Sequence, residues 1–588
     1  RMNTILQEFL EKAARGENVY ISDVRRAFSE AECSILCDLT LPVGGQKRWD
    51  IRIPSATEQA EREFVSEYFY ATLYNILSTF GGSRMTLCLQ PGDNFSKQLC
   101  ETLHDVFQVD IPKNKRRGYG KCLNVTDRIN ASMGMNPFSF EITEAPLAEL
   151  PAEAEQHSNA VLACRSAVEK ANAACVCGID IGGTDIKVVG ILGGKIVAVK
   201  EYDWFPAEMT RMEHLIEPIL LMAEVVRAAI SLPDTPEAAD LREQMLAKGV
   251  SDEAMQSAVE TCRSLYGEAP LLDGIGVCFP DVVIDDQIVG GETYKTRGIR
   301  NASADYDAEF GKLAQLKTLL LKQCKPHGKV HLSNDGSLAA YTAAVEMAHS
   351  AEADSVQYGV FAHTLGTELG TGWIDETGEI PQIPLEVYNC IIDLGNHPAR
   401  RYHELDARSV NNFNTGLSGT LQKYCSQSGA YRLALRIFEE KSPARYAELF
   451  EKGFLEHRDG GVLVRQTPSD MRKPLLEHLM RLASEGDTTA EEIFREIGEF
   501  LAVTFEETEW MLAPRSRARI LFGRFVKHKR CFELMQQGAN TRNDVHFVAG
   551  DGTLAFTPVM LELKSDPVHT VAQFGQAAGA AYFAASQL

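Results

Sequence analysis

The sequence predicts an α/β protein of several domains, and three observations lead to this prediction. The chain has 588 residues, enough for roughly three or four domains of ordinary size. Hydrophobic residues make up 45% of it and charged residues 24%, as in globular proteins. Short apolar runs that end in glycine turns alternate with longer segments whose apolar residues recur at the helical period, which predicts strands followed by helices.

Charge and cysteine content exclude several classes of function. The formal net charge of −22 argues against nucleic acid or an anionic membrane as a partner, because both would repel the chain. The 14 cysteines follow no regular framework, so we expect reduced thiols in a cytoplasmic protein. Cys175 and Cys177 are predicted as buried strand residues rather than metal ligands. The most apolar helical segment, 215–232, carries three charged side chains, which predicts an amphipathic helix and no membrane span.

Residues 1–140 are predicted as a separate N-terminal α/β domain. Residues 48–53 and 84–90 have the pattern of strands, and the segment between them, 58–79, has apolar residues at a helical period. We find no chemistry-bearing motif in this domain. Its basic turn, 114–120, is predicted as a solvated loop, with a phosphate contact as the alternative.

Residues 141–174 follow as a predicted linker and a lead-in helix. The first part of this segment is rich in Glu, Ala and Pro, which is typical of a linker. The second part of the chain then begins abruptly with an apolar strand at Cys175.

A glycine turn between apolar strands is the first motif that carries chemistry. The strand from Cys175 leads into Asp180, and the sequence continues as Gly182-Gly183-Thr184, followed by two more strands in a meander. Glycines let backbone N–H groups approach a phosphate closely, and a threonine hydroxyl can add a donor. Asp180, at the strand end, is placed to hold Mg²⁺ through water. A plain hairpin is the alternative.

A carboxylate at a strand end is the second motif. Residues 330–332 form a short predicted strand, Ser333-Asn334-Asp335-Gly336 interrupts it, and an alanine-rich helix follows. Asp335 alone is equally consistent with a helix N-cap. A carboxylate in this position can also accept the proton of a hydroxyl group that attacks a phosphate.

A second glycine turn follows later in the chain. A predicted strand, 358–363, leads into Thr364-Leu365-Gly366-Thr367. Gly366 would give a phosphate access to the backbone, and Thr367 would donate a hydrogen bond to it. Glu368 comes next, and a carboxylate beside phosphates costs energy unless a cation compensates it.

These three motifs, read as D-I-G-G-T-D-I-K, S-N-D-G-S-L-A-A and T-L-G-T, resemble those of the ROK (repressor, open reading frame, kinase) family and the bacterial glucokinases, within the actin and hexokinase superfamily. The resemblance covers 175–588. It implies two ribonuclease-H-like, actin-like ATPase lobes around a cleft, 175–345 and 346–588, the second with a helical insertion near 426–515. The small-residue segment 575–585 resembles the last helix of the family, which lies close to a neighbouring element.

The resemblance also implies roles for individual residues. Asp335 would be the catalytic base. The phosphate-binding residues would be Gly182, Gly183, Thr184, Lys187, Gly366 and Thr367. Asn334 would orient the acceptor, and the adenosine loop would lie at Gly523 and Arg524, where Arg524 either stacks on adenine or sits on the surface.

The acceptor site departs from the family pattern. The family motif E-x-G-H is replaced by Asp393-Leu394-Gly395-Asn396, and Asn414 stands where the glucokinases carry a sugar-binding Glu. We still expect Asp393, Asn396 and Asn414 to bind substrate, but not glucose, because a pocket built for particular hydroxyls rejects a mismatched ligand. The zinc loop of many family members is absent, so no structural zinc is predicted.

The resemblance therefore predicts a kinase that uses ATP and Mg²⁺ to phosphorylate a hydroxyl of a sugar-like substrate. A non-catalytic nucleotide- or sugar-sensing relative is the alternative, favoured by the altered acceptor site, whereas Asp335 favours the enzyme. A DNA-binding repressor, the other role in the family, is disfavoured by the negative charge. The resemblance is compatible with a homodimer.

Overall fold

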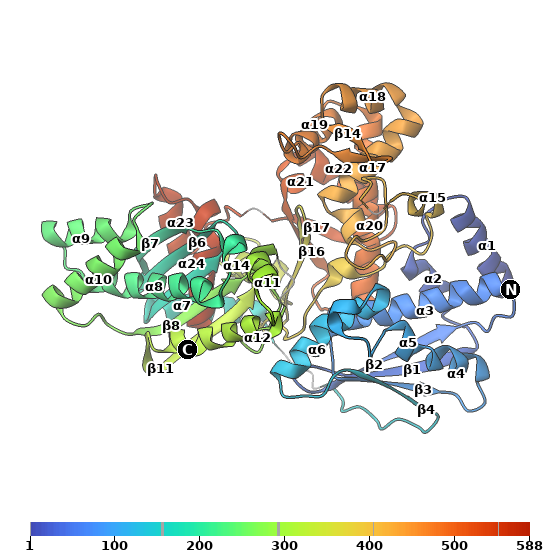
Figure 1. Cartoon of the computed structure of the whole chain (residues 1–588), viewed down its shortest axis with the longest axis horizontal. Coiled ribbons are helices and arrows are strands. Elements are labelled where there is room, and N and C mark those ends of the chain that lie inside the picture. The colour runs from blue at the N-terminus through green and yellow to red at the C-terminus, as the bar shows by residue number, and fades with distance from the viewer. Residues whose placement is uncertain (1, 154–157, 291–293, 404, 551) are drawn as a thin grey trace. The chain divides into compact units, whose positions relative to one another are not determined.

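Helices and strands alternate along the whole chain in a mixed α/β structure with several sheets (Figure 1). The computed structural model describes residues 2–153, 158–290, 294–403, 405–550 and 552–588. The chain divides into two compact units, which are described separately below. Unit 1 comprises Arg1–Glu155, His363–Thr371 and Ile383–Gly550, and unit 2 comprises Gln156–Ala362, Gly372–Gln382 and Asp551–Leu588.

Unit 2 is built on a five-stranded mixed sheet. Strands β5 (Cys175–Ile181), β6 (Asp185–Leu192) and β7 (Lys195–Asp203) form the predicted antiparallel meander. Strands β8 (Leu272–Phe279) and β11 (Cys324–Asn334) run parallel to β5, in the order β11-β8-β5-β6-β7. Because parallel strands end at the same edge of a sheet, the C-terminal ends of β5, β8 and β11 lie together there.

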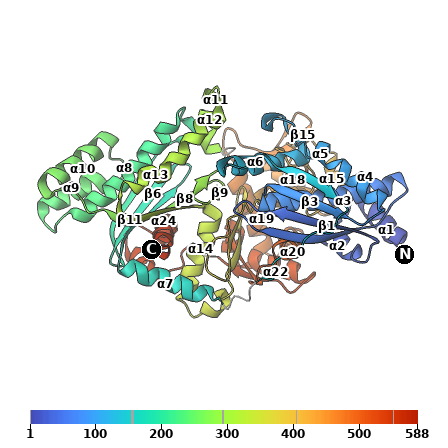
Figure 2. The ribbon, with the colours of Figure 1, turned by 90° about the horizontal axis from the view of Figure 1, so that it is seen from below.

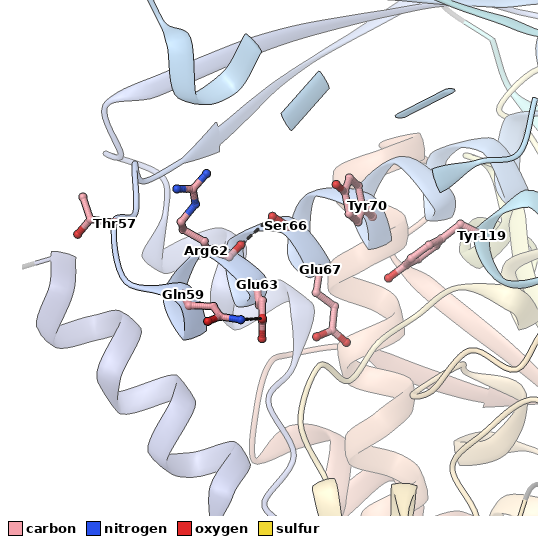
Figure 3. Close-up of a pocket in the computed structure, with 8 residues that line it drawn as sticks. All are labelled: Thr57, Gln59, Arg62, Glu63, Ser66, Glu67, Tyr70 and Tyr119. Carbon is pink, nitrogen blue, oxygen red and sulfur yellow. Dashed lines mark hydrogen bonds between the residues drawn. The ribbon is translucent and has the colours of Figure 1, made fainter. Parts of the chain in front are cut away.

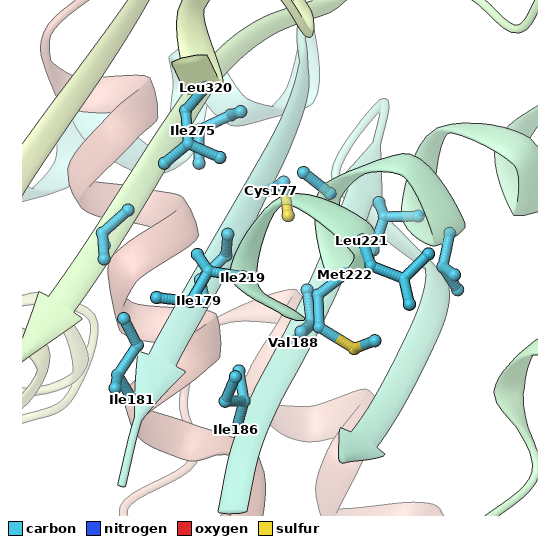
Figure 4. Close-up of a cluster of buried hydrophobic side chains, with 14 of the residues drawn as sticks. Cys177, Ile179, Ile181, Ile186, Val188, Ile219, Leu221, Met222, Ile275 and Leu320 are labelled. Atoms are coloured by element: carbon cyan, nitrogen blue, oxygen red, sulfur yellow. The ribbon is translucent and has the colours of Figure 1, made fainter. Parts of the chain in front are cut away.

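One face of this sheet is covered by an apolar core. Every second side chain of β5, namely Cys177, Ile179 and Ile181, lies on the face covered by α8 (Met212–Ser231). Ile219 and Met222 of α8 pack against them (Figure 4). Helices α10 (Asp252–Tyr266) and α13 (Gln315–Leu321) add to the same cluster. Helix α8 confirms the amphipathic helix predicted at 215–232, and the burial of Cys175 and Cys177 in β5 confirms their predicted place.

The other face of the sheet is covered by α24 (Val571–Ser586), which lies unusually close to it. A Cβ atom on Gly178 would lie 1.8 Å from the carbonyl oxygen of Ala577, and one on Gly276 would lie 2.0 Å from that of Ala580. Gly579 of α24 is equally close to α14 (Asp335–Ala348). A Cβ atom on Gly579 would lie 1.9 Å from Oγ1 of Thr342 in that helix. Glycines are therefore required at both contacts of α24, and the small-residue packing predicted for 575–585 is confirmed.

The N-terminal part of unit 1 has its own four-stranded sheet, in the order β2-β1-β3-β4. Its strands are β1 (Cys33–Thr40), β2 (Gln46–Ile53), β3 (Arg84–Leu89) and β4 (Ser139–Thr143), and its long helix is α3 (Gln59–Phe80). The sequence predicted β2, α3 and β3. Strand β4 pairs with β3 and occupies the beginning of the predicted linker, because its five residues continue the sheet.

The basic turn 114–120 also differs from its prediction as a solvated loop. Arg116 is only 3% exposed, and its guanidinium donates to Asp127 at 2.8 Å. The lead-in helix was predicted correctly and is α7 (Ala160–Asn172) in unit 2.

Another four-stranded sheet has the order β13-β12-β16-β17. Its strands are β12 (Val360–Leu365), β13 (Leu369–Ile374), β16 (Ala518–Gly523) and β17 (His546–Ala549). The predicted helical stretch near 426–515 contains α17 (Gln427–Lys441), α18 (Pro443–Glu451), α19 (Arg472–Ser484) and α20 (Thr488–Leu512). It also contains a hairpin of β14 (Leu455–Arg458) and β15 (Gly461–Val464), which the sequence analysis missed. Figure 2 shows the same elements from below.

The units do not follow the domain boundaries predicted at 140, 174 and 345. The N-terminal segment shares unit 1 with α20, because Trp49 Nε1 donates to Met511 O at 3.2 Å and Arg25 pairs with Glu507. The last 38 residues belong to unit 2 instead of a second lobe that starts at 346, because α24 packs on β5 and β8. The two units therefore group the chain differently from the predicted boundaries, which stay a prediction.

Two further expectations concern the whole chain. All 14 cysteines are buried and free of disulfides. Among the residues that the structure describes, no helix is long and apolar enough to cross a membrane.

We predict that Gly276→Ala destabilises unit 2 by about 1–3 kcal/mol, since the added methyl group overlaps the backbone of α24. Urea unfolding followed by circular dichroism measures this change. Gly311→Ala is the matched control, because nothing lies within 4 Å of a Cβ there. A Gly276→Ala variant as stable as the control would contradict the close packing.

Candidate functional site

The first glycine turn joins β5 to β6 in unit 2. Gly182 N donates to Asp185 O at 2.8 Å, and a Cβ on Gly182 would lie 2.9 Å from the same oxygen, which explains the need for glycine. Gly183 and Thr184 are exposed at the tip. The turn is therefore tight, and its tip is open to a ligand.

Trp204, directly after β7, fixes the orientation of this turn. Its indole Nε1 donates to Gly182 O at 3.0 Å, and its backbone N donates to Thr184 O at 3.1 Å. In a trans peptide the C=O and N–H point in opposite directions. The N–H groups of Gly183 and Asp185 therefore point away from Trp204, so that two donors are available on the opposite side of the turn. Backbone N–H groups arranged in this way can bind an anion.

Lys187 lies on β6 directly opposite Asp180 on β5, so their side chains share one face of the sheet. The Nζ of Lys187 lies 3.3 Å from Asp185 Oδ1. Its positive charge opposes the rise in the pKa of Asp180 that burial causes. Lys187 thus belongs to the turn region, where it balances the two carboxylates. Its predicted contact with phosphate stays a prediction.

Asp335 follows the end of β11 as the first residue of α14. The helix cap is Asn334, whose Oδ1 accepts from Gly336 N at 2.9 Å, and Oδ1 of Asp335 accepts from the same N–H group at 2.8 Å. Asn334 Nδ2 donates to Asp281 O at 2.8 Å. Asn334 therefore holds the strand end in place, and its predicted contact with an acceptor would have to use its remaining N–H.

Asp180 and Asp335, the two acidic side chains at the strand ends of the site, influence each other. Register pairs Asp180 with Cys278 of β8, whose thiol hydrogen-bonds to the Asp180 carboxyl. The pKa of Asp180 is raised to about 6, chiefly by burial, and the nearby charge of Asp335 contributes to this rise. Gln576 of α24 joins the group, because its Nε2 donates to Asp335 O at 2.9 Å and to Cys278 Sγ at 3.5 Å.

The surrounding protein also raises the pKa of Asp335, although its side chain remains accessible to solvent. The main cause is the surrounding protein, which limits the hydration of the carboxyl group, and the positive charge of Lys295 is the chief opposing effect. A carboxylate with a raised pKa that solvent can still reach is suited to accept a proton.

Lys295 connects the base to the glycine turn. Its Cε lies 3.3 Å from the position that a Cβ on Gly183 would occupy, so the lysine side chain lies against the turn. The structure thus brings together Asp180, Gly182, Gly183, Thr184, Lys187, Asn334 and Asp335, and adds Lys295 to them. Within unit 2 the site therefore combines backbone N–H groups, carboxylates and a lysine ammonium group.

The second glycine turn joins β12 to β13. Gly366 N donates to Glu368 O at 3.2 Å, and Gly366 O accepts from Gln427 N at 3.0 Å. Gln422 Oε1 accepts from Leu369 N at 2.8 Å. Thr367 and Glu368 are exposed at the tip. The turn is held from α16 (Gln422–Cys425) and α17, and its phosphate contact stays a prediction.

Gly523 lies beside this turn, at the end of β16. Its φ is +113°, and a Cβ there would lie 2.4 Å from Leu365 O, so only glycine fits. Arg524 Nη1 donates to Glu477 Oε1 at 3.1 Å on the surface. This ion pair favours the surface alternative for Arg524, and the nucleotide contact of both residues stays a prediction.

Asp393 makes structural hydrogen bonds, and its predicted contact with substrate stays a prediction. The residue is 0% exposed. Its Oδ1 accepts from Val19 N and Gly395 N, both at 2.8 Å, and its Oδ2 accepts from the hydroxyl of Tyr424. A carboxylate with these three donors has little capacity left for a ligand. The sequence could not show this, because Val19 lies far away in the chain.

The N-terminal segment also occupies Asn396. This residue is 2% exposed, its Nδ2 donates to Asn18 Oδ1 at 3.2 Å, and its backbone N donates to Glu17 O at 2.9 Å. Its polar groups are therefore used within the protein, as those of Asp393 are, and its predicted contact with substrate stays a prediction. Asn414 is exposed in a loop whose turn is held by Asn412, so its predicted role is not contradicted.

No protein-family model matches the sequence, and no curated protein is similar to it in sequence. Among solved structures, a ROK family glucokinase from Streptomyces griseus in complex with glucose and AMPPNP is 15% identical with a TM-score of 0.36 over 70% of this chain and 98% of its own.

Two further solved structures are similar to the same extent. A ROK hexokinase from Thermus thermophilus is 15% identical with a TM-score of 0.37, over 70% of this chain and 98% of its own. A ROK family transcriptional regulator, a homologue of the Escherichia coli MLC protein, is 12% identical with a TM-score of 0.38, over 70% of this chain and 81% of its own. Because these TM-scores are low, the function is inferred below from the residues of the site.

Four residues of the site were not predicted: Trp204, Cys278, Lys295 and Gln576. Trp204 left a usable signal, since it is one of only 4 tryptophans and directly follows the meander. Lys295 and Gln576 left none, because their approach to Asp335 depends on tertiary packing.

We predict that Asp180→Asn stabilises unit 2 by on the order of 2 kcal/mol at neutral pH. The raised pKa means that the ionised Asp180 carboxyl destabilises the fold. This cost is absent below the unfolded pKa, grows as the pH rises toward about 6, and is complete above it. Urea unfolding of both proteins between pH 4.5 and 8 measures the difference. A variant less stable than the wild type at pH 8 would contradict the assignment.

Proposed function

We propose that the protein is an ATP-dependent kinase that transfers a phosphoryl group to a hydroxyl of a sugar-like acceptor. The observation that carries this proposal is the arrangement inside unit 2, where an accessible carboxylate, Asp335, lies with Asp180 and Lys295 beside a turn that offers backbone donors. Phosphoryl transfer requires little beyond such positioning and compensation of charge.

Each group would have one task. The N–H groups of Gly183 and Asp185 would bind phosphate oxygens, and Lys295 would compensate the charge that develops on the transferred group. Asp335 would accept the proton of the attacking hydroxyl. The two-lobed arrangement and the phosphate contact of Gly366 and Thr367, which belong to unit 1, remain part of this proposal.

Asp180 fits a magnesium ion that arrives with the nucleotide. Mg²⁺ keeps most of its water and commonly takes only one or two carboxylates from a protein, together with phosphate oxygens. No cluster of three or more potential metal ligands occurs among the residues that the structure describes, which suits a cation held mainly by its nucleotide. When bound, Mg²⁺ would neutralise phosphate charge, and Asp180 would orient its water shell.

A nucleotide sensor without catalytic activity is the second candidate. The observation that favours it is that Asp393 and Asn396 hydrogen-bond to the protein itself, so that two predicted acceptor contacts are occupied. Such a protein would bind ATP without turning over any acceptor.

We expect Asp335→Ala to lower phosphoryl transfer by roughly 10²–10⁴-fold, because the hydroxyl loses its base. ATP consumption measured over a panel of sugars and polyols, with mass spectrometry of the phosphorylated product, tests this. Activity of the wild type should fall as the pH drops through the raised pKa of Asp335. Full turnover in Asp335→Ala would refute the base, and ATP binding without any product would favour the sensor.

We expect Lys295→Met to lower kcat by roughly 10–10³-fold with a smaller effect on ATP affinity, since the ammonium acts on charge that develops during transfer. Lys295→Arg should restore part of the rate. Lys322→Met, an exposed lysine elsewhere in unit 2, is the control. Equal rates for Lys295→Met and the control would remove Lys295 from the mechanism.

A further inference from the structure

A groove runs along α3 in unit 1, apart from the turns and the base discussed above. Its volume is about 540 Å³, within the range of pockets that hold small ligands. It is lined by Thr57, Gln59, Arg62, Glu63, Ser66, Glu67, Tyr70 and Tyr119 (Figure 3). Six of these residues belong to one helix, so a single rigid element forms most of the groove.

Helical spacing arranges the lining in two rows. Arg62, Ser66 and Tyr70 are four residues apart in one row, and Gln59, Glu63 and Glu67 are four apart in the other. Gln59 Nε2 donates to Glu63 Oε1 at 2.9 Å within the second row. In Figure 3 the Arg62 side chain points to the opposite side of the helix from Glu63 and Glu67. One side of the groove is therefore acidic.

Tyr119 closes one end of the groove from η2 (Gly118–Lys121). Its ring centroid lies 5.7 Å from those of Tyr74 and Phe107 and 5.9 Å from that of Tyr70. Gly118 N donates to Thr415 O at 2.8 Å, which anchors the turn from below. The tyrosine is thus fixed in position, and Figure 3 shows its hydroxyl end directed toward Glu67.

Glu67 is the carboxylate at this closed end. Its side chain is 39% exposed, and its only ion pair within the described part of the chain is a long one, to Arg400 Nη2 at 3.5 Å. Burial raises its pKa, Asp393 adds to the effect, and Arg400 opposes it. A negative charge that is accessible and only partly compensated would be stabilised by a cation placed beside it.

We propose that this groove binds a small hydroxylated organic cation, with its ammonium group between the carboxylate of Glu67 and the hydroxyl of Tyr119. A phenolic oxygen can accept a hydrogen bond from an ammonium group. The hydroxyl and amide groups of Thr57, Gln59 and Ser66 match the hydroxyl groups of such a ligand. An anion would meet two glutamates and one arginine, Arg62, among the lining residues, while Arg400 already pairs with Glu67. A fully apolar ligand would leave the polar groups of the lining without partners.

The groove belongs to unit 1 and uses none of the residues assigned to phosphoryl transfer. The inference therefore goes beyond the proposed kinase activity. A protein without any kinase activity would leave it intact, and an active kinase with an empty groove would refute it alone.

Isothermal titration calorimetry of the full chain without nucleotide tests the ligand class. Glucosamine is the probe, glucose is its neutral counterpart, and ethanolamine is a cation with a single hydroxyl. Glucosamine should bind at least ~10-fold more tightly than glucose at pH 7.5, and its affinity should decrease at lower pH as Glu67 takes up a proton. Equal affinities for glucosamine and glucose, or no binding of glucosamine, would overturn the proposal.

The Glu67→Gln variant tests the residue, because it removes the charge and keeps the shape. It should weaken glucosamine binding at least ~10-fold while leaving glucose binding unchanged. Glu101→Gln, an exposed glutamate of α4 (Asn94–Glu101), is the matched control, and circular dichroism verifies folding. Equal glucosamine affinity in both variants would exclude Glu67 as the anchor.

Discussion

The close approach of α24 to the sheet of unit 2 is the constraint on which the site depends. Gly178 and Gly276 admit the helix backbone to a distance that no Cβ would allow, and Gly579 admits α14 to α24 in turn. This packing fixes two elements at once, because β5 carries Asp180 and α14 begins with Asp335. It also brings Gln576 to Asp335 O and Cys278. The acidic pair is therefore positioned by backbone contacts, whose distances leave little freedom.

The backbone donors of the first glycine turn are also positioned by a small number of contacts. Trp204 takes two carbonyl oxygens of the turn, so peptide geometry alone directs two N–H groups to the other side. Burial then raises the pKa of both acids, and Lys187 and Lys295 limit the rise. Two carboxylates in such proximity are costly in the absence of a cation, which is how a site for a charged ligand differs from a structural ion pair.

The sequence allowed the meander, the first glycine turn and the strand end before Asp335 to be predicted, because each depends on local patterns of apolar residues and glycine. It did not allow the places of Asp393 and Asn396 to be predicted. Both are occupied by Asn18, Val19 and the neighbouring backbone, which are some 370 residues away in the chain. Strand β4 was missed for a related reason, since its polar composition resembles a linker until β3 supplies its partner.

Asp393 and Asn396 form hydrogen bonds with the N-terminal segment, and these bonds limit what the two side chains could contribute to binding an acceptor. In the resemblance these positions contact sugar hydroxyls, but here their polar atoms bind the protein itself, and a carboxylate with three donors gains nothing by exchanging one of them for a ligand. Removal of the N-terminal segment would take the Val19 N–H away from the buried Asp393 carboxylate and leave it with two donors, Gly395 N and the Tyr424 hydroxyl. The N-terminal region is thus part of the architecture of unit 1, and its deletion would damage the fold of unit 1 before it altered a substrate preference.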